Sequence, residues 1–144
     1  MTPVATDGRI ELLANVPLFS SLSRRELTAI GRACRETSCP SGREIVREGS
    51  PAHQLYVIVS GQAMARRDGR RTAMLGPGRC FGELAIVDRA PSPSTIVADS
   101  DVSLLVLARR QFKAVLDQVP AVGAKLVVAL ARRLREADRR SAVL

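Results

Sequence analysis

Glycine interrupts the middle of this chain at short intervals, and this spacing limits the fold more than any other feature. Between Pro40 and Leu107, short apolar and β-branched segments alternate with turn signals, which is typical of an antiparallel roll or barrel of short strands. We expect strands over residues 44–47, 54–60, 62–67, 71–75, 95–98 and 102–107. The glycines that punctuate the region are Gly42, Gly49, Gly61, Gly69, Gly76 and Gly78.

Helical patterns flank this region on both sides. Ser23 and Glu26 form a capping-box pattern, so a helix is expected to begin near Arg24. A shorter helix is expected over residues 10–14, and two more follow residue 108, the second beginning at Pro120. The expected apolar positions are Leu27, Ile30 and Cys34 in the first long helix, Phe112, Val115, Leu116 and Val119 in the next, and Leu126, Leu130, Leu134 and Ala137 in the last.

Length and apolar content favour one compact domain. The chain has 144 residues, 46% of them hydrophobic, which is enough to bury a core. Its apolar runs are far shorter than the roughly 20 residues of a membrane span, and the N-terminus lacks a signal-peptide pattern. We therefore expect a cytoplasmic protein that does not enter a membrane. Three cysteines without CxxC spacing and one histidine favour mostly buried thiols, and neither a disulfide framework nor a metal site.

The charge is strongly positive, since 22 Lys and Arg outnumber 14 Asp and Glu for a formal charge of +8. Such an excess favours polyanions, anionic membranes or acidic partners. An arginine-rich composition with few lysines is equally typical of a high-GC coding bias. Aromatic residues make up only 3%, so stacking platforms for bases are scarce.

The segment Phe81-Gly82-Glu83-Leu84-Ala85-Ile86, running on to Thr95, resembles the phosphate-binding cassette of the cyclic nucleotide-binding domain family. Further matches flank it in the family's order: Gly42, Arg47-Glu48-Gly49, Leu55-Tyr56-Val57-Ile58 with Gly61, and Leu75-Gly76-Pro77-Gly78. The resemblance implies an α+β, mainly β fold, an antiparallel double-stranded β-roll (jelly roll) of about eight strands between helices. We expect one domain over residues 1–144, with helices in 1–35, the β-roll in 36–107 with the cassette at 81–95, and helices in 108–144.

The resemblance also implies a binding site for cyclic AMP or another nucleotide as an effector, with no resident cofactor. Gly82 would let the backbone approach the ligand, and a short helix beginning near it would direct N–H groups at the phosphate. Glu83 would accept a hydrogen bond from the ribose 2′-hydroxyl; the alternative is a surface carboxylate. The candidate ligand-binding residues are Phe81, Gly82, Glu83, Leu84, Ala85, Arg89, Ser92, Pro93 and Ser94.

The second half of the cassette departs from the family pattern. The phosphate-binding arginine is expected nine residues after Glu83, where this chain has Ser92, and Pro93 then offers neither a hydroxyl nor an N–H group. Two lost charge-assisted contacts of about 1.5–3 kcal/mol each predict cyclic AMP binding that is weaker by roughly two to three orders of magnitude. Arg89 or Arg79 would have to swing into the pocket as a replacement, although both positions are more typical of solvated arginines.

Function is expected to be regulatory rather than catalytic, because one histidine, His53, does not complete a catalytic set. The first hypothesis is a sensor domain that is weak or atypical for cyclic AMP. The alternative is a vestigial pocket on a protein-interaction module that acts through its C-terminal helix and basic surface. Nucleic-acid binding by charge ranks last, because no helix-turn-helix follows and no DNA-binding domain is expected. Leu126, Leu130 and Leu134 would pack on the β-roll or form a homodimer seam.

Overall fold

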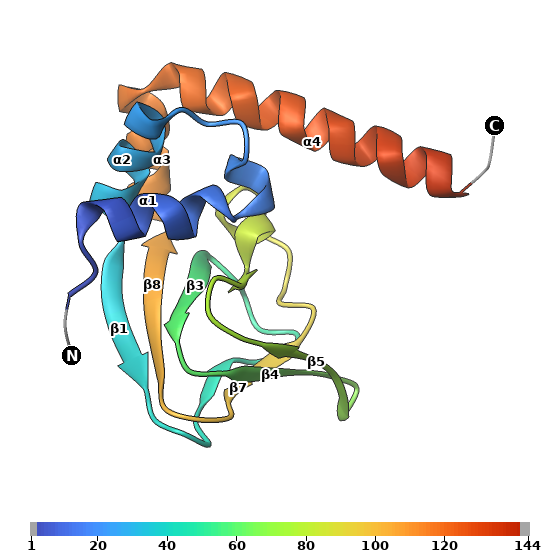
Figure 1. The fold of residues 1–144 in the computed structure, drawn as a ribbon. Coiled ribbons are helices and arrows are strands. Elements are labelled where there is room, and N and C mark those ends of the chain that lie inside the picture. The colour runs from blue at the N-terminus through green and yellow to red at the C-terminus, as the bar shows by residue number, and fades with distance from the viewer. Residues whose placement is uncertain (1–2, 142–144) are drawn as a thin grey trace.

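Two antiparallel sheets of four strands form the body of the protein in a computed structural model, which describes residues 3–141 (Figure 1). One sheet has the order β1-β8-β3-β6 and the other β2-β7-β4-β5. The expected mainly β fold with eight strands and flanking helices is confirmed. The strands are β1 (Arg35–Cys39), β2 (Glu44–Val46), β3 (Gln54–Ser60), β4 (Ala63–Arg67), β5 (Arg70–Leu75), β6 (Cys80–Phe81), β7 (Thr95–Ala98) and β8 (Val102–Ala108).

Helices lie before, within and after the β-roll. Three elements precede it: α1 (Thr6–Ala14), the 3-10 helix η1 (Pro17–Phe19) and α2 (Arg24–Ala33). The 3-10 helix η2 (Glu83–Ile86) lies inside it, and α3 (Arg109–Gln118) and α4 (Pro120–Ser141) follow. Figure 1 shows the N-terminal helices and α3 packed at one end of the sheets, with α4 crossing above them and projecting outward.

The six segments expected as strands correspond to β2, β3, β4, β5, β7 and β8. Two strands were not expected. The first, β1, pairs with β8 from Arg35 opposite Val106 to Cys39 opposite Val102. Its sequence is polar because it lies at a sheet edge and buries only Cys39, so neither alternation nor β-branched enrichment marks it. The second, β6, has only two residues, too few to form a pattern.

Strand β8 separates two apolar clusters, because successive side chains of a strand point to opposite faces. Leu105 and Leu107 belong to the cluster beneath the helices, and Leu104 and Val106 belong to the cluster between the sheets. Under the helices, the rings of Phe19 and Phe112 lie with centroids 5.9 Å apart. The sheet that contains β8 therefore packs against the other sheet on one face and against the helices on its other face.

The expected capping box begins α2 at Arg24. The Ser23 N–H donates to Glu26 Oε1 at 2.7 Å, and the Glu26 N–H donates to Ser23 Oγ at 3.2 Å. Glu26 is only 7% exposed, and it also accepts a hydrogen bond from Lys125 Nζ at 2.7 Å. These hydrogen bonds from Lys125 and Ser23 lower the pKa of the Glu26 carboxyl. The carboxylate thereby joins α2 to the first half of α4.

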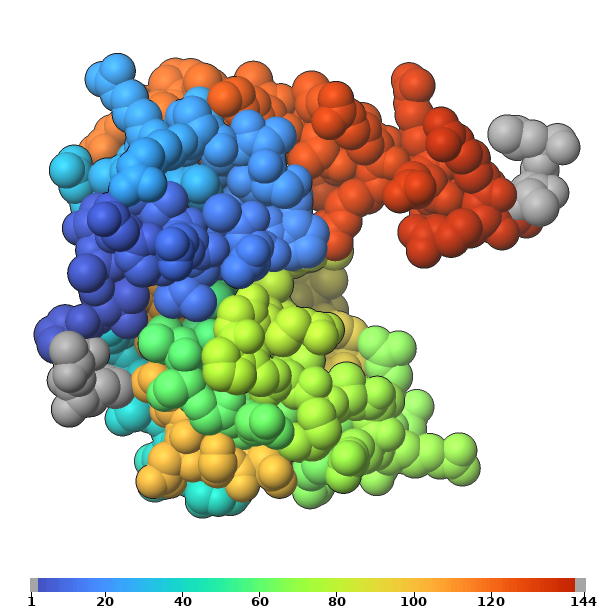
Figure 2. Space-filling view, viewed as in Figure 1, coloured from blue at the N-terminus to red at the C-terminus, as the bar shows by residue number. Residues whose placement is uncertain are grey.

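The apolar seam expected along α4 is divided rather than continuous. Leu126 is 4% exposed and belongs to the core beneath the helices, and Leu130 packs against that core. Leu134 is 65% exposed, and Val127, two helical turns before it, is 67% exposed. Residues 131–141 are all exposed, and the second half of α4 stands clear of the β-roll in the space-filling view (Figure 2).

Within residues 3–141, no single helix is both long and apolar enough to cross a membrane; α3 and α4 meet both criteria only when taken together, across a bend of 113°. The cysteines follow the expectation of mostly buried thiols. Cys34 and Cys39 are buried and Cys80 is half-buried, all three as free thiols. Burial raises the pKa of Cys34 to about 12, so this thiol stays protonated and unreactive.

Candidate functional site

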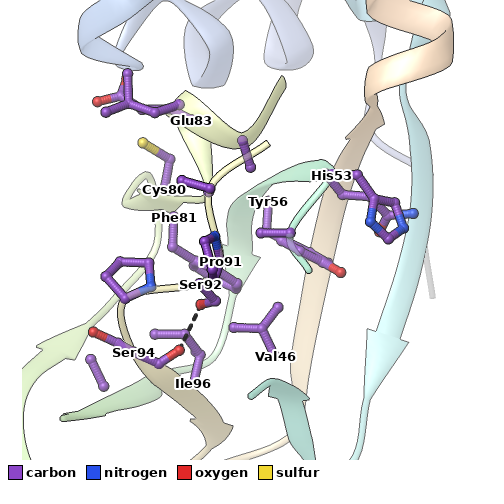
Figure 3. Close-up of a pocket in the computed structure, with 18 of the residues that line it drawn as sticks. Val46, His53, Tyr56, Cys80, Phe81, Glu83, Pro91, Ser92, Ser94 and Ile96 are labelled. Carbon is purple, nitrogen blue, oxygen red and sulfur yellow. Dashed lines mark hydrogen bonds between the residues drawn. The ribbon is translucent and has the colours of Figure 1, made fainter. Parts of the chain in front are cut away.

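A pocket of about 660 Å³ opens between the two sheets, beneath the cassette (Figure 3). Its floor and walls come from strands of both sheets, and its remaining side comes from the cassette and the loop that precedes β3. Tyr56 and Phe81 stack in the wall with ring centroids 4.8 Å apart and ring planes 13° from parallel. The aliphatic lining residues include Val46, Ala65, Ala73, Leu75, Leu84 and Ile96.

Gly82 sets the backbone path at the start of the cassette. Its φ is +78°, in the left-handed region, and a Cβ at this position would lie 2.4 Å from the carbonyl oxygen of Gln54. Only glycine fits both conditions. The helix expected near Gly82 is present as η2, a single 3-10 turn in which Ala85 and Ile86 are buried. Leu84 remains 45% exposed at the edge of the pocket.

Arg109, the first residue of α3, holds the cassette in place through hydrogen bonds to backbone carbonyls. Its Nε donates to the carbonyl of Ala85 at 3.0 Å, and its Nη2 donates to the carbonyls of Ala52 at 2.9 Å and Asp88 at 2.6 Å. The guanidinium therefore satisfies carbonyls at the end of η2 and in the loop before β3. Sequence analysis missed this residue, since an arginine that opens a helix 24 positions away carries no local signal of the contact.

Glu83 lies at the end of the pocket that faces the helices, away from Ser92 and Ser94 (Figure 3). Its Oε2 accepts the Leu18 N–H at 3.2 Å, and its Oε1 accepts Arg133 Nη2 at 2.7 Å. The Glu83 side chain is 14% exposed and the Arg133 side chain is 44% exposed. The Glu83 carboxylate therefore does not lie on the open surface but joins the cassette to η1 and α4. Its role toward a ribose stays a prediction.

Ser92 stands at the position of the expected phosphate-binding arginine. It lines the pocket, but its hydroxyl and backbone groups are already hydrogen-bonded. Its Oγ donates to the Ser94 carbonyl at 2.7 Å, the dashed contact in Figure 3. Its N–H donates to Ser50 O, and its carbonyl accepts the Gly49 N–H, both at 2.9 Å. The hydroxyl is thus already satisfied without a ligand.

The arginines proposed as replacements do not enter the pocket. Arg89 and Arg79 are both exposed, and neither lines it. An arginine that sequence analysis had not singled out, Arg67 on β4, comes near the cassette instead, where its Nε donates to the Pro93 carbonyl at 3.0 Å. Pro93 itself lines the pocket from an exposed position.

The lining residues within 3–141 include no lysine and no arginine. Their ionisable side chains are His53, Cys80, Glu83 and Asp88, together with the Tyr56 phenol. Burial, with a smaller contribution from the Glu83 carboxylate, raises the pKa of Cys80 to about 11, so its thiol is neutral at physiological pH. In the described part of the chain, no three His, Cys, Asp or Glu side chains are grouped to hold a metal ion.

Of the nine candidate residues, eight come together around the pocket and Arg89 does not. Phe81, Gly82, Glu83, Leu84 and Ala85 form one side, and Ser92, Pro93 and Ser94 form the other. The candidate site is therefore a mostly apolar chamber with an intact cassette turn and no cation among its described lining.

Comparison with known proteins identifies the family that this chain resembles. The profile of the family described as "Cyclic nucleotide-binding domain" matches residues 36–119. The chain is 35% identical over 127 residues to a "Cyclic AMP receptor protein" of Thermus thermophilus, covering 85% of this chain and 59% of that protein. It is 34% identical over 107 residues to a "cAMP-dependent protein kinase regulatory subunit" of Hypocrea atroviridis, covering 74% of this chain and 23% of that protein.

A solved structure shares the architecture. The N-terminal domain of a transcriptional regulator from Streptomyces coelicolor superimposes with a TM-score of 0.84 at 31% identity, covering 90% of this chain and 94% of that one. The chain spans 59% of the length of the Thermus relative, less than two thirds.

Proposed function

The chain belongs to the cyclic nucleotide-binding domain family, and from that premise we propose that it is a non-enzymatic sensor that holds a small effector in the pocket beneath its cassette. The observation that carries the proposal is the pocket itself, closed on one side by a cassette turn that only Gly82 can make. A chamber of this size, lined by apolar groups with a few polar ones, is typical of small-molecule sites. Its cytoplasmic location remains a prediction.

Cyclic AMP is expected to bind weakly. The Ser92 hydroxyl is engaged by the Ser94 carbonyl, and no cationic side chain among the described lining residues would pair with a cyclic phosphate. Glu83, the expected partner of the ribose, is held by Leu18 and Arg133. A cyclic nucleotide would have to displace these contacts before its ribose could hydrogen-bond to Glu83.

The output of the sensor is proposed to be the position of α4. Glu83 touches both the pocket and Arg133, so a ligand group that takes over its carboxylate would release the second half of α4. The first half would stay in place, because Val122 and Leu126 are buried and Lys125 is paired with Glu26. The change would therefore be confined to the exposed part of the helix.

Calorimetric titration with cyclic AMP and cyclic GMP tests this function, with hydrogen exchange of α4 as the second measurement. We expect weak binding of cyclic AMP and faster exchange in residues 131–141 when ligand is present. Binding in the low micromolar range or tighter would contradict the weakness assigned to Ser92. A ligand that fills the pocket without any change in α4 would contradict the proposed output.

A second function, protein interaction through α4, is favoured by one observation. Val127 and Leu134 lie seven residues apart, on one face of the helix, and are 67% and 65% exposed. We propose a second copy of this chain as the partner, because an equivalent helix would cover the same stripe in a symmetric pair. Sedimentation of the chain and of Leu134→Asp tests this: a dimer that the substitution dissociates is expected, and a monomer at all concentrations would contradict it.

A further inference from the structure

The pocket is electrostatically unlike the rest of the chain. Lys and Arg make up 22 of the 144 residues, yet none lines the pocket within the described residues 3–141, whereas Asp88 and Glu83 do. We propose that this pocket selects an uncharged, largely apolar small molecule over the anionic phosphodiester of a cyclic nucleotide. The inference rests on the proposed sensor function of the same pocket and names the chemical class of its ligand.

An anion would enter without a partner of opposite charge. Two guanidinium groups near the cassette are turned to backbone carbonyls, Arg67 to Pro93 and Arg109 to Ala85, Ala52 and Asp88, and a third, that of Arg133, is paired with Glu83. Removing an ion from water costs several kcal/mol unless a charge or several hydrogen bonds replace its hydration. The nearby carboxylates of Asp88 and Glu83 add repulsion rather than compensation, although Arg133 offsets the charge of Glu83.

An uncharged ligand meets no such penalty and gains from burial. The walls present aliphatic side chains and the stacked rings of Tyr56 and Phe81. Each Å² of apolar surface removed from water contributes about 25 cal/mol, so a molecule of two or three rings has enough surface to bind. The 660 Å³ volume lies inside the range of roughly 300–1,000 Å³ of ligand pockets. The protonated thiol of Cys80 also adds no charge to the wall.

The chain carries its own optical reporter of the pocket. It has one tyrosine and no tryptophan, and Tyr56 is half-buried in the pocket wall. Its tyrosine emission therefore comes from this wall alone. Quenching of that emission shows that a bound aromatic molecule lies near this wall, and a variant on the exposed stripe of α4 separates the two locations.

The experiment uses two dyes that share one ring system and differ in charge. N-phenyl-1-naphthylamine is neutral, and 8-anilinonaphthalene-1-sulfonate carries a sulfonate. The full chain is titrated with each dye and with cyclic AMP at pH 8. We expect the neutral dye to bind at least tenfold more tightly than either anion and to quench Tyr56.

Two variants locate the binding. Ala73→Phe fills the pocket and should abolish binding of the neutral dye, whereas Leu134→Ser on the exposed face of α4 should leave it unchanged. If Ala73→Phe does not fold, binding and Tyr56 quenching that Leu134→Ser leaves unchanged still exclude the exposed face of α4 as the location. Equal or tighter binding of cyclic AMP or of the sulfonated dye would overturn the ligand class and leave the sensor function standing. Failure of all three molecules to bind would overturn both.

Discussion

Replacing Ser92 with arginine would return a cation to the pocket, and the structure sets the size of the expected effect. A guanidinium at this position would pair with the cyclic phosphate through two parallel hydrogen bonds. A single charge-assisted bond contributes about 1.5–3 kcal/mol, which corresponds to tighter cyclic AMP binding by about 10- to 150-fold. Pro93 still lacks a hydroxyl and an N–H group, so the second lost contact is not regained.

The loss of the serine does not reduce this gain in affinity. The bond from Ser92 Oγ to the Ser94 carbonyl is made without ligand, and its removal lowers the free energy of unfolding of free and bound protein alike. The expected decrease is about 0.5–1.5 kcal/mol. The backbone bonds of Ser92 to Ser50 and Gly49 do not involve the side chain and should survive.

Isothermal titration of the unaltered chain, Ser92→Arg and Ser92→Gln with cyclic AMP is the assay. Glutamine matches much of the length of arginine without its charge, so the difference between the two variants measures the cation. Raising the salt concentration should narrow that difference, because screening weakens a partly exposed pair. If Ser92→Arg binds cyclic AMP no more tightly than Ser92→Gln, the missing cation is not what limits affinity, and the argument from the pocket lining is refuted.

Three further predictions concern the cassette turn and the contacts that hold α4. Gly82→Ala should lower the free energy of unfolding by more than about 2 kcal/mol in chemical denaturation, because alanine is strained in the left-handed region and its Cβ would clash with the Gln54 carbonyl. Gly76→Ala is the control, because a Cβ at that position meets no atom within 4 Å. Equal losses of stability in the two variants would contradict this prediction. Glu26→Gln should destabilise the fold by about 1–3 kcal/mol at pH 7. Because folding lowers the pKa of Glu26, its carboxylate stabilises the folded protein above the ordinary pKa of about 4.5, and this stabilisation is lost as the pH falls through the folded pKa. A stability difference between the unaltered chain and Glu26→Gln that persists in acid would contradict the ion pair. Arg133→Ala should change stability by less than about 1 kcal/mol but speed hydrogen exchange in residues 131–141, and unchanged exchange would contradict the link to Glu83.

Local patterns predicted the elements whose causes are themselves local. The capping box at Ser23 fixed the start of α2 because both of its hydrogen bonds lie within four residues. The glycine-punctuated segments predicted six strands, since turns need particular residues at particular positions. The cassette turn was predicted through Gly82, because a left-handed residue against the Gln54 backbone excludes every side chain.

Contacts between distant segments could not be predicted. Glu83 and Arg133 are 50 positions apart, and nothing near either residue indicates the other. The same holds for Arg109, which bonds to the cassette from the start of α3. Edge strand β1 was missed for a related reason, because its residues are polar. Its position is fixed by pairing with β8 rather than by its own sequence, and the pair closest in sequence, Cys39 opposite Val102, is 63 positions apart.

Two features of this pocket oppose the binding of a cyclic nucleotide, the pairing of Glu83 with Arg133 and the missing cation beside Ser92, and they differ in how easily a ligand could compensate for them. The pair of Glu83 and Arg133 is partly exposed, with Arg133 at 44%, and such pairs contribute only about 0–1 kcal/mol, so a ribose hydroxyl could displace Arg133 at little cost. The absence of a cation beside Ser92 has no such remedy, because Arg67 and Arg109 are held by backbone carbonyls that would lose their donors if either guanidinium moved. Leaving the partly buried carbonyls of Ala85 and Ala52 without their donor would cost about 1–3 kcal/mol, which is as much as a phosphate contact would gain, whereas the exposed bond from Arg67 to Pro93 costs less to break. In the proposed sensor, the phosphate half of the site, and not the ribose half, would therefore determine which ligands the pocket accepts, and the large positive charge elsewhere on the chain would not alter that selection.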